Sequence, residues 1–180
     1  MARLRSTVAA LFLVVGVAVA AAPMPALAQY ASQFRIVGQV AHPTAYDLAG
    51  LQALPATKLD VAFLAEPAPV NASFTGVLLW DLLNIAGVIT NPNVKNDILR
   101  KQVIVTGSDG YEATFALGEI DPFFGGHQVI VAYLQDGNPL DQNSGFARII
   151  APNDKAGGRD VFNIVRIRVT GPIGPGSAAE

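Results

Sequence analysis

Basic side chains and glycines gather in the second half of the chain, where they suit an anion-binding site. Arg148, Lys155 and Arg159 flank residues 152–154 (PND) and the glycine pair at 157–158. Guanidinium and ammonium groups that converge with glycine backbone amides can hold a phosphate or another anion. The alternative interpretation is a solvated loop that follows a strand with one arginine on its face. The residues alone leave both interpretations open.

Two further side chains, Tyr111 and His127, are candidates for lining a pocket. Tyr111 lies beside the turn at residues 109–110, and His127 follows FFGG at 123–126, a glycine-hinged loop that can cover a pocket. The two histidines, His42 and His127, lie far apart and belong to no spaced ligand set. The sequence therefore predicts no metal site built from side chains.

Short strands separated by turns are predicted to position these side chains. Beta-branched and aromatic residues fill segments bounded by Gly, Pro, Asn or Asp, which is typical of strands. Leucines at helical spacing predict two short helices, at 46–54 and 77–86. Short helices on a mostly antiparallel sheet indicate an α+β fold, with 160–169 as an antiparallel or edge-exposed strand. The expected strands are 34–40, 58–64, 102–106, 111–115, 128–134, 147–151 and 160–169.

The two ends of the chain are expected to lie outside the folded domain. Residues 1–28 are predicted to be an export signal, because a basic start precedes an apolar run at 8–22 and residues 26–28 (ALA) form an A-x-A cleavage site. We expect cleavage before Gln29, a periplasmic or secreted mature chain, and no membrane attachment after cleavage. An uncleaved anchor is the alternative. Residues 171–180 are poor in large apolar side chains and are predicted to be a disordered tail.

Composition excludes one class of partner and bounds the domain count. The whole chain has a formal charge of -2, and residues 29–180 carry 10 basic against 14 acidic side chains. A nucleic-acid partner would require a basic face, so none is expected. We expect one domain, at residues 29–170, which is long enough for a core of its own. Cysteine is absent, so packing alone must hold the domain and no thiolate chemistry is available.

From residue 46 onward the order of these motifs resembles the molybdopterin-binding domain of the sulfite oxidase family. The resemblance rests on DLAGLQALP (47–55), FTGVLLWDLLNIAGV (74–88), VIVTGSDGYEATFALGEI (103–120), VIVAYLQDGNPL (129–140) and GFARIIAPNDKAGGRDV (145–161). It implies an α+β fold of mixed, mostly antiparallel sheets with a few short helices. It also implies a molybdopterin cofactor, whose dithiolene sulfurs hold molybdenum in the family together with one cysteine thiolate.

The molybdenum-ligating cysteine of the family corresponds to a position within residues 65–73 (AEPAPVNAS), where this chain has none. Alanine, proline and valine cannot replace a soft thiolate ligand, and Ser73 or Glu66 would make a much weaker and differently tuned site. The resemblance therefore implies a pterin pocket, while the missing cysteine predicts that molybdenum is not held in the usual way.

In the family a histidine, an arginine and a lysine hold the pterin phosphate, and the matching stretch here surrounds Arg148. Arg148 and Gly145 keep their family positions. Asn143 or Ser144 stands where the histidine lies, and Phe162 stands at the lysine position. One strong anion contact of the three is therefore retained. The cofactor-binding residues that the resemblance implies are Arg148, Asn143, Ser144, Gly145, Lys155 and Arg159.

Three functions follow from these expectations as alternatives. The favoured one is an exported, degenerate family member that binds a pterin, another small anionic ligand or a partner protein in the former cofactor pocket, without the usual molybdenum chemistry. The second is an active periplasmic oxidoreductase with a cysteine-free molybdopterin site. The third is a structural or accessory periplasmic domain. A concave pocket lined by Arg148 and the 123–127 loop would separate the first two from the third.

Overall fold

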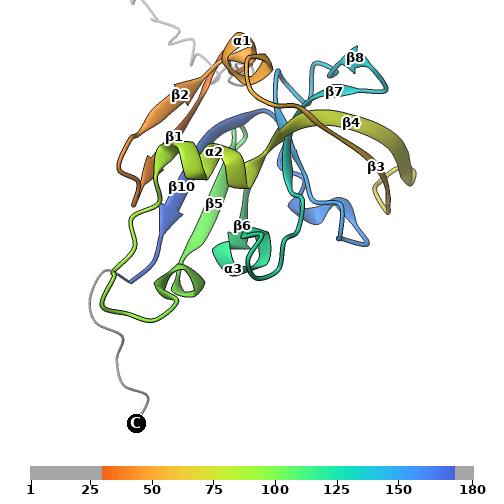
Figure 1. The fold of residues 1–180 in the computed structure, drawn as a ribbon. Helices are drawn as coiled ribbons and strands as arrows, with labels where there is room; N and C mark the ends of the chain where they lie inside the picture. Colours follow the sequence, from red (N-terminus) through yellow and green to blue (C-terminus); the bar gives the residue numbers. More distant parts are fainter. Residues whose placement is uncertain (1–29, 173–180) are drawn as a thin grey trace, which may run out of the picture.

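The computed structural model describes residues 30–172, which form two sheets with short helices packed against them (Figure 1). The first sheet has five strands in the order β2-β1-β10-β5-β6. Its central strand, β10, runs parallel to β1 and antiparallel to β5. The strands are β1 (Phe34–Gly38), β2 (Thr44–Tyr46), β5 (Gln102–Gly107), β6 (Glu112–Ala116) and β10 (Ile164–Thr170).

The second sheet is antiparallel and has the order β3-β4-β7-β8, with β9 paired to β7. Its register shifts between Thr75 and Gly76, where β4 changes its alignment with β7. Gly76 has no room for a Cβ, because the backbone of Val131 and Ala132 passes directly over it. The strands are β3 (Thr57–Phe63), β4 (Val70–Leu78), β7 (Ile130–Gln135), β8 (Asn138–Pro139) and β9 (Arg148–Ile150).

Short helices occupy the connections between strands. Helix α1 (Leu48–Gln52) begins after Asp47, whose side chain accepts a hydrogen bond from Gly50 N at 2.8 Å. Helix α2 (Leu79–Ala86) follows β4 directly and ends at Gly87, which adopts a positive φ of 70°. The other helical turns are α3 (Leu117–Ile120) and the 3-10 turns η1 (Asp97–Arg100) and η2 (Gly157–Arg159).

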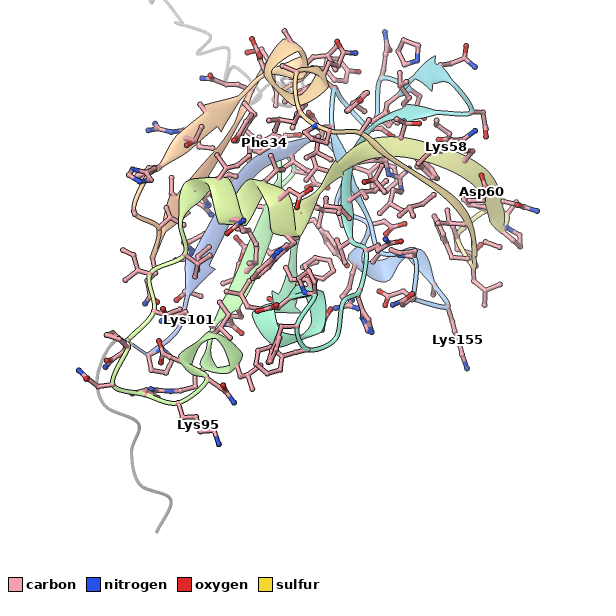
Figure 2. The ribbon with its side chains drawn as sticks, viewed as in Figure 1. Phe34, Lys58, Asp60, Lys95, Lys101 and Lys155 are labelled. Atoms are coloured by element: carbon pink, nitrogen blue, oxygen red, sulfur yellow. The ribbon has the colours of Figure 1, made fainter. Side chains whose placement is uncertain are left out.

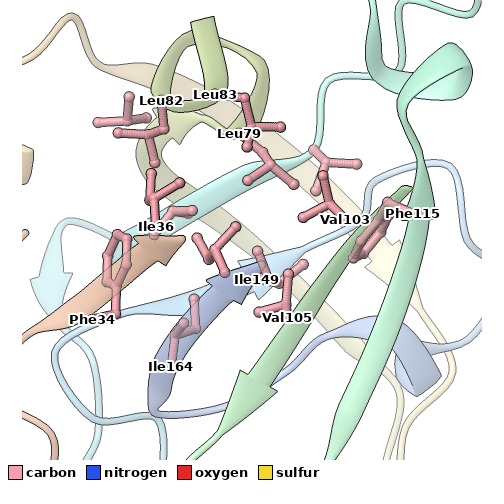
Figure 3. Close-up of a cluster of buried hydrophobic side chains, with 14 of the residues drawn as sticks. Phe34, Ile36, Leu79, Leu82, Leu83, Val103, Val105, Phe115, Ile149 and Ile164 are labelled. Atoms are coloured by element: carbon pink, nitrogen blue, oxygen red, sulfur yellow. The ribbon is translucent and has the colours of Figure 1, made fainter. Parts of the chain in front are cut away.

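Two apolar clusters hold the sheets together. In the larger one, the buried leucines of α2 lie over residues of the first sheet such as Ile36 and Val103, as Figure 3 shows. The smaller cluster belongs to the second sheet and contains Phe63 and Phe74, which are almost completely buried. Burial of such side chains stabilises the fold by about 1.5 to 3 kcal/mol each. The smaller cluster also forms the floor of the site described below.

A buried ion pair fastens the end of β10 to the segment that precedes β5. Lys101 and Asp97 are each only 3% exposed. The Lys101 ammonium lies 3.3 Å from Asp97 Oδ2 and donates hydrogen bonds to Gln39 Oε1 at 3.0 Å and Pro172 O at 3.1 Å. All three ammonium protons therefore have acceptors, as a buried lysine requires.

The expected fold class is confirmed: the sheets are mixed and mostly antiparallel, and the helices are few and short. The expected strands overlap β1, β3, β5, β6, β7, β9 and β10, and the expected helices overlap α1 and α2. The last expected strand, 160–169, corresponds to β10, which pairs antiparallel with β5 as one of the two alternatives predicted. The other alternative, an edge position, is wrong, because β1 pairs with the opposite side of β10. Strands β2, β4 and β8 and helix α3 were not expected.

Most residues of the predicted terminal segments lie outside the described part of the chain. The predicted export signal, 1–28, lies there entirely. Of the predicted tail, Gly171 and Pro172 are described, and their carbonyl oxygens accept hydrogen bonds from Gln39 and Lys101. Within residues 30–172 no helix has the length and apolar character needed to cross a membrane.

Candidate functional site

A pocket of about 830 Å³ lies at the end of the β3–β4 hairpin. One wall is the turn between these strands, and the facing wall comes from the segment between β9 and β10, which Figure 1 shows beside the hairpin. A buried arginine, Arg148, lies at the start of β9 between the two walls. The lining residues are Phe63, Leu64, Ala65, Glu66, Pro67, Ala68, Pro69, Val70, Arg148, Ala156, Gly157, Gly158 and Phe162.

The two walls are joined along one side by a parallel bridge between Leu64 and Ala156. Leu64 N donates a hydrogen bond to Lys155 O at 2.9 Å, and Gly157 N donates one to Leu64 O at 2.9 Å. Leu64 and Phe162 are 64% and 42% exposed, so the rim of the pocket presents large apolar side chains to solvent. A ligand with an apolar or aromatic body could cover these side chains on binding.

Arg148 is held in the pocket by two aromatic rings and one carboxylate. Its guanidinium carbon lies 3.8 Å from the centroid of the Phe162 ring and 5.4 Å from that of Phe74. Its Nη2 is 3.7 Å from Asp160 Oδ2. Only 5% of Arg148 is exposed, so the cation is stacked and largely removed from water.

The charges of Arg148 and Asp160 are only partly compensated. Burial lowers the pKa of Arg148 and raises the pKa of Asp160 to about 6, while their mutual attraction opposes both shifts. Asp160 Oδ1 accepts a hydrogen bond from Ala151 N at 2.9 Å. Arg148 Nε and Asp160 Oδ2 are buried and have no hydrogen-bond partner within the described residues. The protein therefore compensates the charge of Arg148 incompletely, and an anionic ligand in the pocket could complete that compensation.

Arg159 lies outside the pocket lining and is engaged by other side chains. Its guanidinium forms two hydrogen bonds to Asp154, at 2.8 and 2.7 Å, and one to Glu119 at 2.7 Å. It also lies 4.6 Å from the Phe115 ring centroid. The bidentate bond to Asp154, followed by that to Glu119, raises the pKa of Arg159. These contacts tie the segment at 154–159 to β6 and α3.

Lys155, Tyr111 and His127 also lie outside the pocket lining. Lys155 is exposed, and Figure 2 shows its side chain extending away from the ribbon. The Tyr111 hydroxyl donates a hydrogen bond to Gly158 O, so Tyr111 supports the pocket wall from behind. His127 is half-buried, and its backbone N–H donates to Glu119 O at 2.9 Å. Direct contact of these three side chains with a ligand stays a prediction.

Asn143, Ser144 and Gly145 form the turn that leads into β9. Asn143 is exposed, whereas Ser144 is buried and its N–H donates to Asp141 Oδ1 at 2.8 Å. Gly145 adopts a positive φ of 66° and packs so closely on Asn163 that no Cβ would fit. None of the three lines the pocket, although the turn fixes where Arg148 begins its strand.

The sequence predicts several residues of the pocket, but it does not predict that they lie next to one another. The family cysteine region at 65–73 supplies one wall, and Phe162, at the family lysine position, stacks on Arg148. The glycine pair at 157–158, for which the sequence leaves an anion-binding loop and a solvated loop open, forms part of the other wall. What could not be foreseen is the bridge from Leu64 to Ala156, because it joins segments more than 90 residues apart.

The two packed sheets and the pocket beside Arg148 define an α+β domain with a ligand-sized cavity at the end of one sheet. Residues 21–172 match the family model described as "Oxidoreductase molybdopterin binding domain". The chain belongs to this family and is thus related to the sulfite oxidase-type oxidoreductases, as the motifs indicated. No curated protein matches the chain.

Among solved structures, the fold is similar to that in the sulfane dehydrogenase SoxCD from Paracoccus pantotrophus. The TM-score is 0.60 and the sequence identity is 21%. The match covers 76% of this chain and 37% of the SoxCD chain, so this protein corresponds to a minor part of that chain. At this identity the similarity supports the fold, which agrees with the mixed sheets described above.

Proposed function

We propose that this protein is a ligand-binding member of the family, in which the pocket beside Arg148 holds a pterin or a related small organic anion without the usual molybdenum chemistry. The observation that carries the proposal is the buried Arg148 guanidinium, which lines a pocket of about 830 Å³ and whose ion-pair partner, Asp160 Oδ2, lies 3.7 Å away without a hydrogen bond. A planar ligand could lie along the apolar rim, and its anionic group could pair with the Arg148 guanidinium.

The donor set of the pocket fits a pterin better than it fits molybdenum. Soft metal centres of this kind take thiolate ligands, and the chain contains no cysteine. Glu66 is the one carboxylate among the lining residues, and the described residues contain no group of three or more His, Cys, Asp or Glu side chains that could hold a metal ion. Arg148, in contrast, suits an anionic oxygen on an organic ligand.

A substitution at Gly158 is expected to block the pocket without harming the fold. Gly158 lines the pocket, and a Cβ added there would meet no atom within 4 Å. We expect Gly158→Leu to weaken the binding of pterin-6-carboxylate by at least about tenfold, with an unchanged melting temperature. Titration followed by pterin fluorescence measures the affinity. Gly158→Ala is the matched control and should bind like the wild type; equal binding by Gly158→Leu would place the ligand elsewhere.

Arg148→Gln tests the anion contact itself. We expect this variant to lose the binding of pterin-6-carboxylate. Arg35→Gln, which changes an exposed arginine on β1, should bind this probe like the wild type. Circular dichroism and thermal melting must accompany the titration, because Arg148 also faces the buried Asp160. Full binding by a folded Arg148→Gln variant would contradict the proposal. An unfolded variant would assign Arg148 a structural role. The comparison of Gly158→Leu with Gly158→Ala would then decide whether the pocket binds the probe.

The alternative of an active molybdenum oxidoreductase is tested by elemental analysis. Protein purified from its native cells, under conditions in which other molybdoenzymes are loaded, should contain no stoichiometric molybdenum by mass spectrometry. Stoichiometric molybdenum together with a pterin would favour the cysteine-free oxidoreductase. A structural role without any ligand would be favoured if neither pterin probes nor native extracts supply a molecule that binds.

We further propose that the domain works in the periplasm or outside the cell, after removal of residues 1–28. The support is the basic start, the apolar run and the A-x-A motif of the sequence. The mature protein should begin at Gln29, which intact-mass analysis of the exported chain measures directly. A full-length mass in the membrane fraction would instead favour an uncleaved anchor.

A further inference from the structure

β3 is an edge strand of the second sheet, and its outer side is open for most of its length. In the sheet order it has β4 on one side and no strand on the other. The outward backbone groups can be assigned from Leu64, which follows β3 and directs both its N–H and its C=O away from β4 to the segment at 155–157. Because backbone direction alternates along a strand, Lys58, Asp60 and Ala62 also direct theirs outward.

These outward backbone groups have no partner within residues 30–172, and the side chains beside them are free as well. No strand pairing or hydrogen bond in the described part of the chain engages the outer edge at Lys58, Asp60 or Ala62. The Lys58 and Asp60 side chains are exposed and take part in none of the ion pairs found there. Figure 2 shows both at the side of the molecule, along one strand. An unpaired edge of this kind can accept another strand.

The charges on the β3 edge are complementary to those on the same edge of a second copy of the chain. When two copies of β3 pair antiparallel about a two-fold axis at Leu59, each Lys58 lies opposite the Asp60 of the other copy. Both residues direct their backbone groups outward, so each such pair also exchanges two backbone hydrogen bonds. Leu59 then faces its own copy on the opposite side of the sheet, where apolar side chains favour contact.

Neighbouring registers are disfavoured for identifiable reasons. An axis at Asp60 would place the two Asp60 carboxylates opposite each other, and an axis at Lys58 would do the same with two ammonium groups. An axis at Val61 would pair Lys58 with Leu64, whose backbone is already bonded to the segment at 155–157. The axis at Leu59 is the one of these that satisfies both the charges and the backbone.

We propose that the protein forms a two-fold symmetric dimer through antiparallel pairing of the two β3 edges, with the axis at Leu59. The partner is a second copy of this chain, and the contact consists of Lys58–Asp60 ion pairs, backbone hydrogen bonds and a Leu59–Leu59 contact. Isolated edge charges usually oppose such pairing, but opposite charges two residues apart favour it in this one register. The dimer is independent of any ligand in the pocket.

Reversing the charges at Lys58 and Asp60 tests the dimer, because single reversals should weaken it and the double reversal should restore it. Lys58→Asp places two carboxylates opposite two others, and Asp60→Lys does the same with ammonium groups. We expect each single variant to raise the dimer dissociation constant by at least about tenfold in sedimentation velocity at low salt. The double variant Lys58→Asp/Asp60→Lys restores both pairs and should dimerise like the wild type. An equimolar mixture of the two single variants should form a heterodimer.

A cysteine placed on the axis tests the register. Because the natural chain has no cysteine, Leu59→Cys introduces a single thiol that would face its copy within disulfide reach. Mild oxidation should give a covalent dimer of Leu59→Cys and none of Ala62→Cys, since residue 62 lies far from its copy in this register. A wild type that sediments as a monomer at every concentration would overturn the proposal, as would single charge reversals without effect. Equal cross-linking at both positions would overturn the register.

Discussion

Phe74→Ala is expected to lower the free energy of unfolding by about 3 to 5 kcal/mol and to abolish ligand binding. Phe74 lies on β4, is fully buried in the smaller apolar cluster, and supports the Arg148 guanidinium at 5.4 Å. Truncation leaves a cavity beneath a buried cation, because the surrounding strands cannot collapse far enough to fill it. Urea denaturation measures the stability, and the pterin-6-carboxylate titration measures the binding.

Phe123→Ala is the matched control, because it removes the same atoms from a side chain that is 84% exposed. We expect its free energy of unfolding to stay within about 0.5 kcal/mol of the wild type. Its binding should also be unchanged, since Phe123 lies outside the pocket lining. A Phe74→Ala variant as stable as Phe123→Ala would mean that the smaller cluster does not hold the second sheet together.

Asp160→Asn is expected to remove a component of the stability that decreases as the pH rises. Burial raises the pKa of Asp160 to about 6, above its value of about 3.9 in an unfolded chain. Between these values the folded chain binds more protons than the unfolded chain, so ionisation of Asp160 destabilises the fold. From pH 4 to pH 7 the variant should gain roughly 2 kcal/mol relative to the wild type. Urea denaturation at several pH values measures this difference.

Asp154→Asn provides a control of opposite sign. The hydrogen bond from Arg159 lowers the pKa of Asp154, so its ionised form stabilises the fold near neutral pH, and this contribution is lost as the pH falls through its folded pKa. Asp154→Asn should therefore be less stable than the wild type at neutral pH and approach it in acid. If the difference between wild type and Asp160→Asn is constant with pH, the carboxyl of Asp160 is not perturbed by burial.

The strands that the sequence predicts correctly are rich in beta-branched residues, whereas the longest of the missed strands, β4, is interrupted by residues that disfavour a strand. β4 contains Asn71, Ser73 and Gly76, which local preference assigns to a loop. The strand forms because Ala72 and Phe74 face the smaller cluster and because β3 and β7 pair with it on both sides. Tertiary pairing therefore overrides local preference here, and no window of sequence contains its cause.

The same limit applies to the charged residues of the site. Arg148 precedes an apolar strand, and its place beside a pocket could be anticipated from the motif that surrounds it. Arg159 belongs to the same motif, yet its guanidinium pairs with Asp154 and with Glu119, the latter 40 residues earlier. Which of two neighbouring arginines remains available to a ligand depends on such distant carboxylates, which spacing along the chain does not reveal.

The segment at 154–159 has contacts to both sheets, since Lys155 and Gly157 bond to Leu64 after β3 while Arg159 bonds to Glu119 after β6. The pocket wall therefore belongs to the joint between the sheets and exists only while they are docked. In a chain that kept its strands but let the sheets separate, far-UV circular dichroism would change little and binding would vanish. Ligand affinity at this site thus reports on the docking of the two sheets, which spectroscopic measures of strand content do not detect.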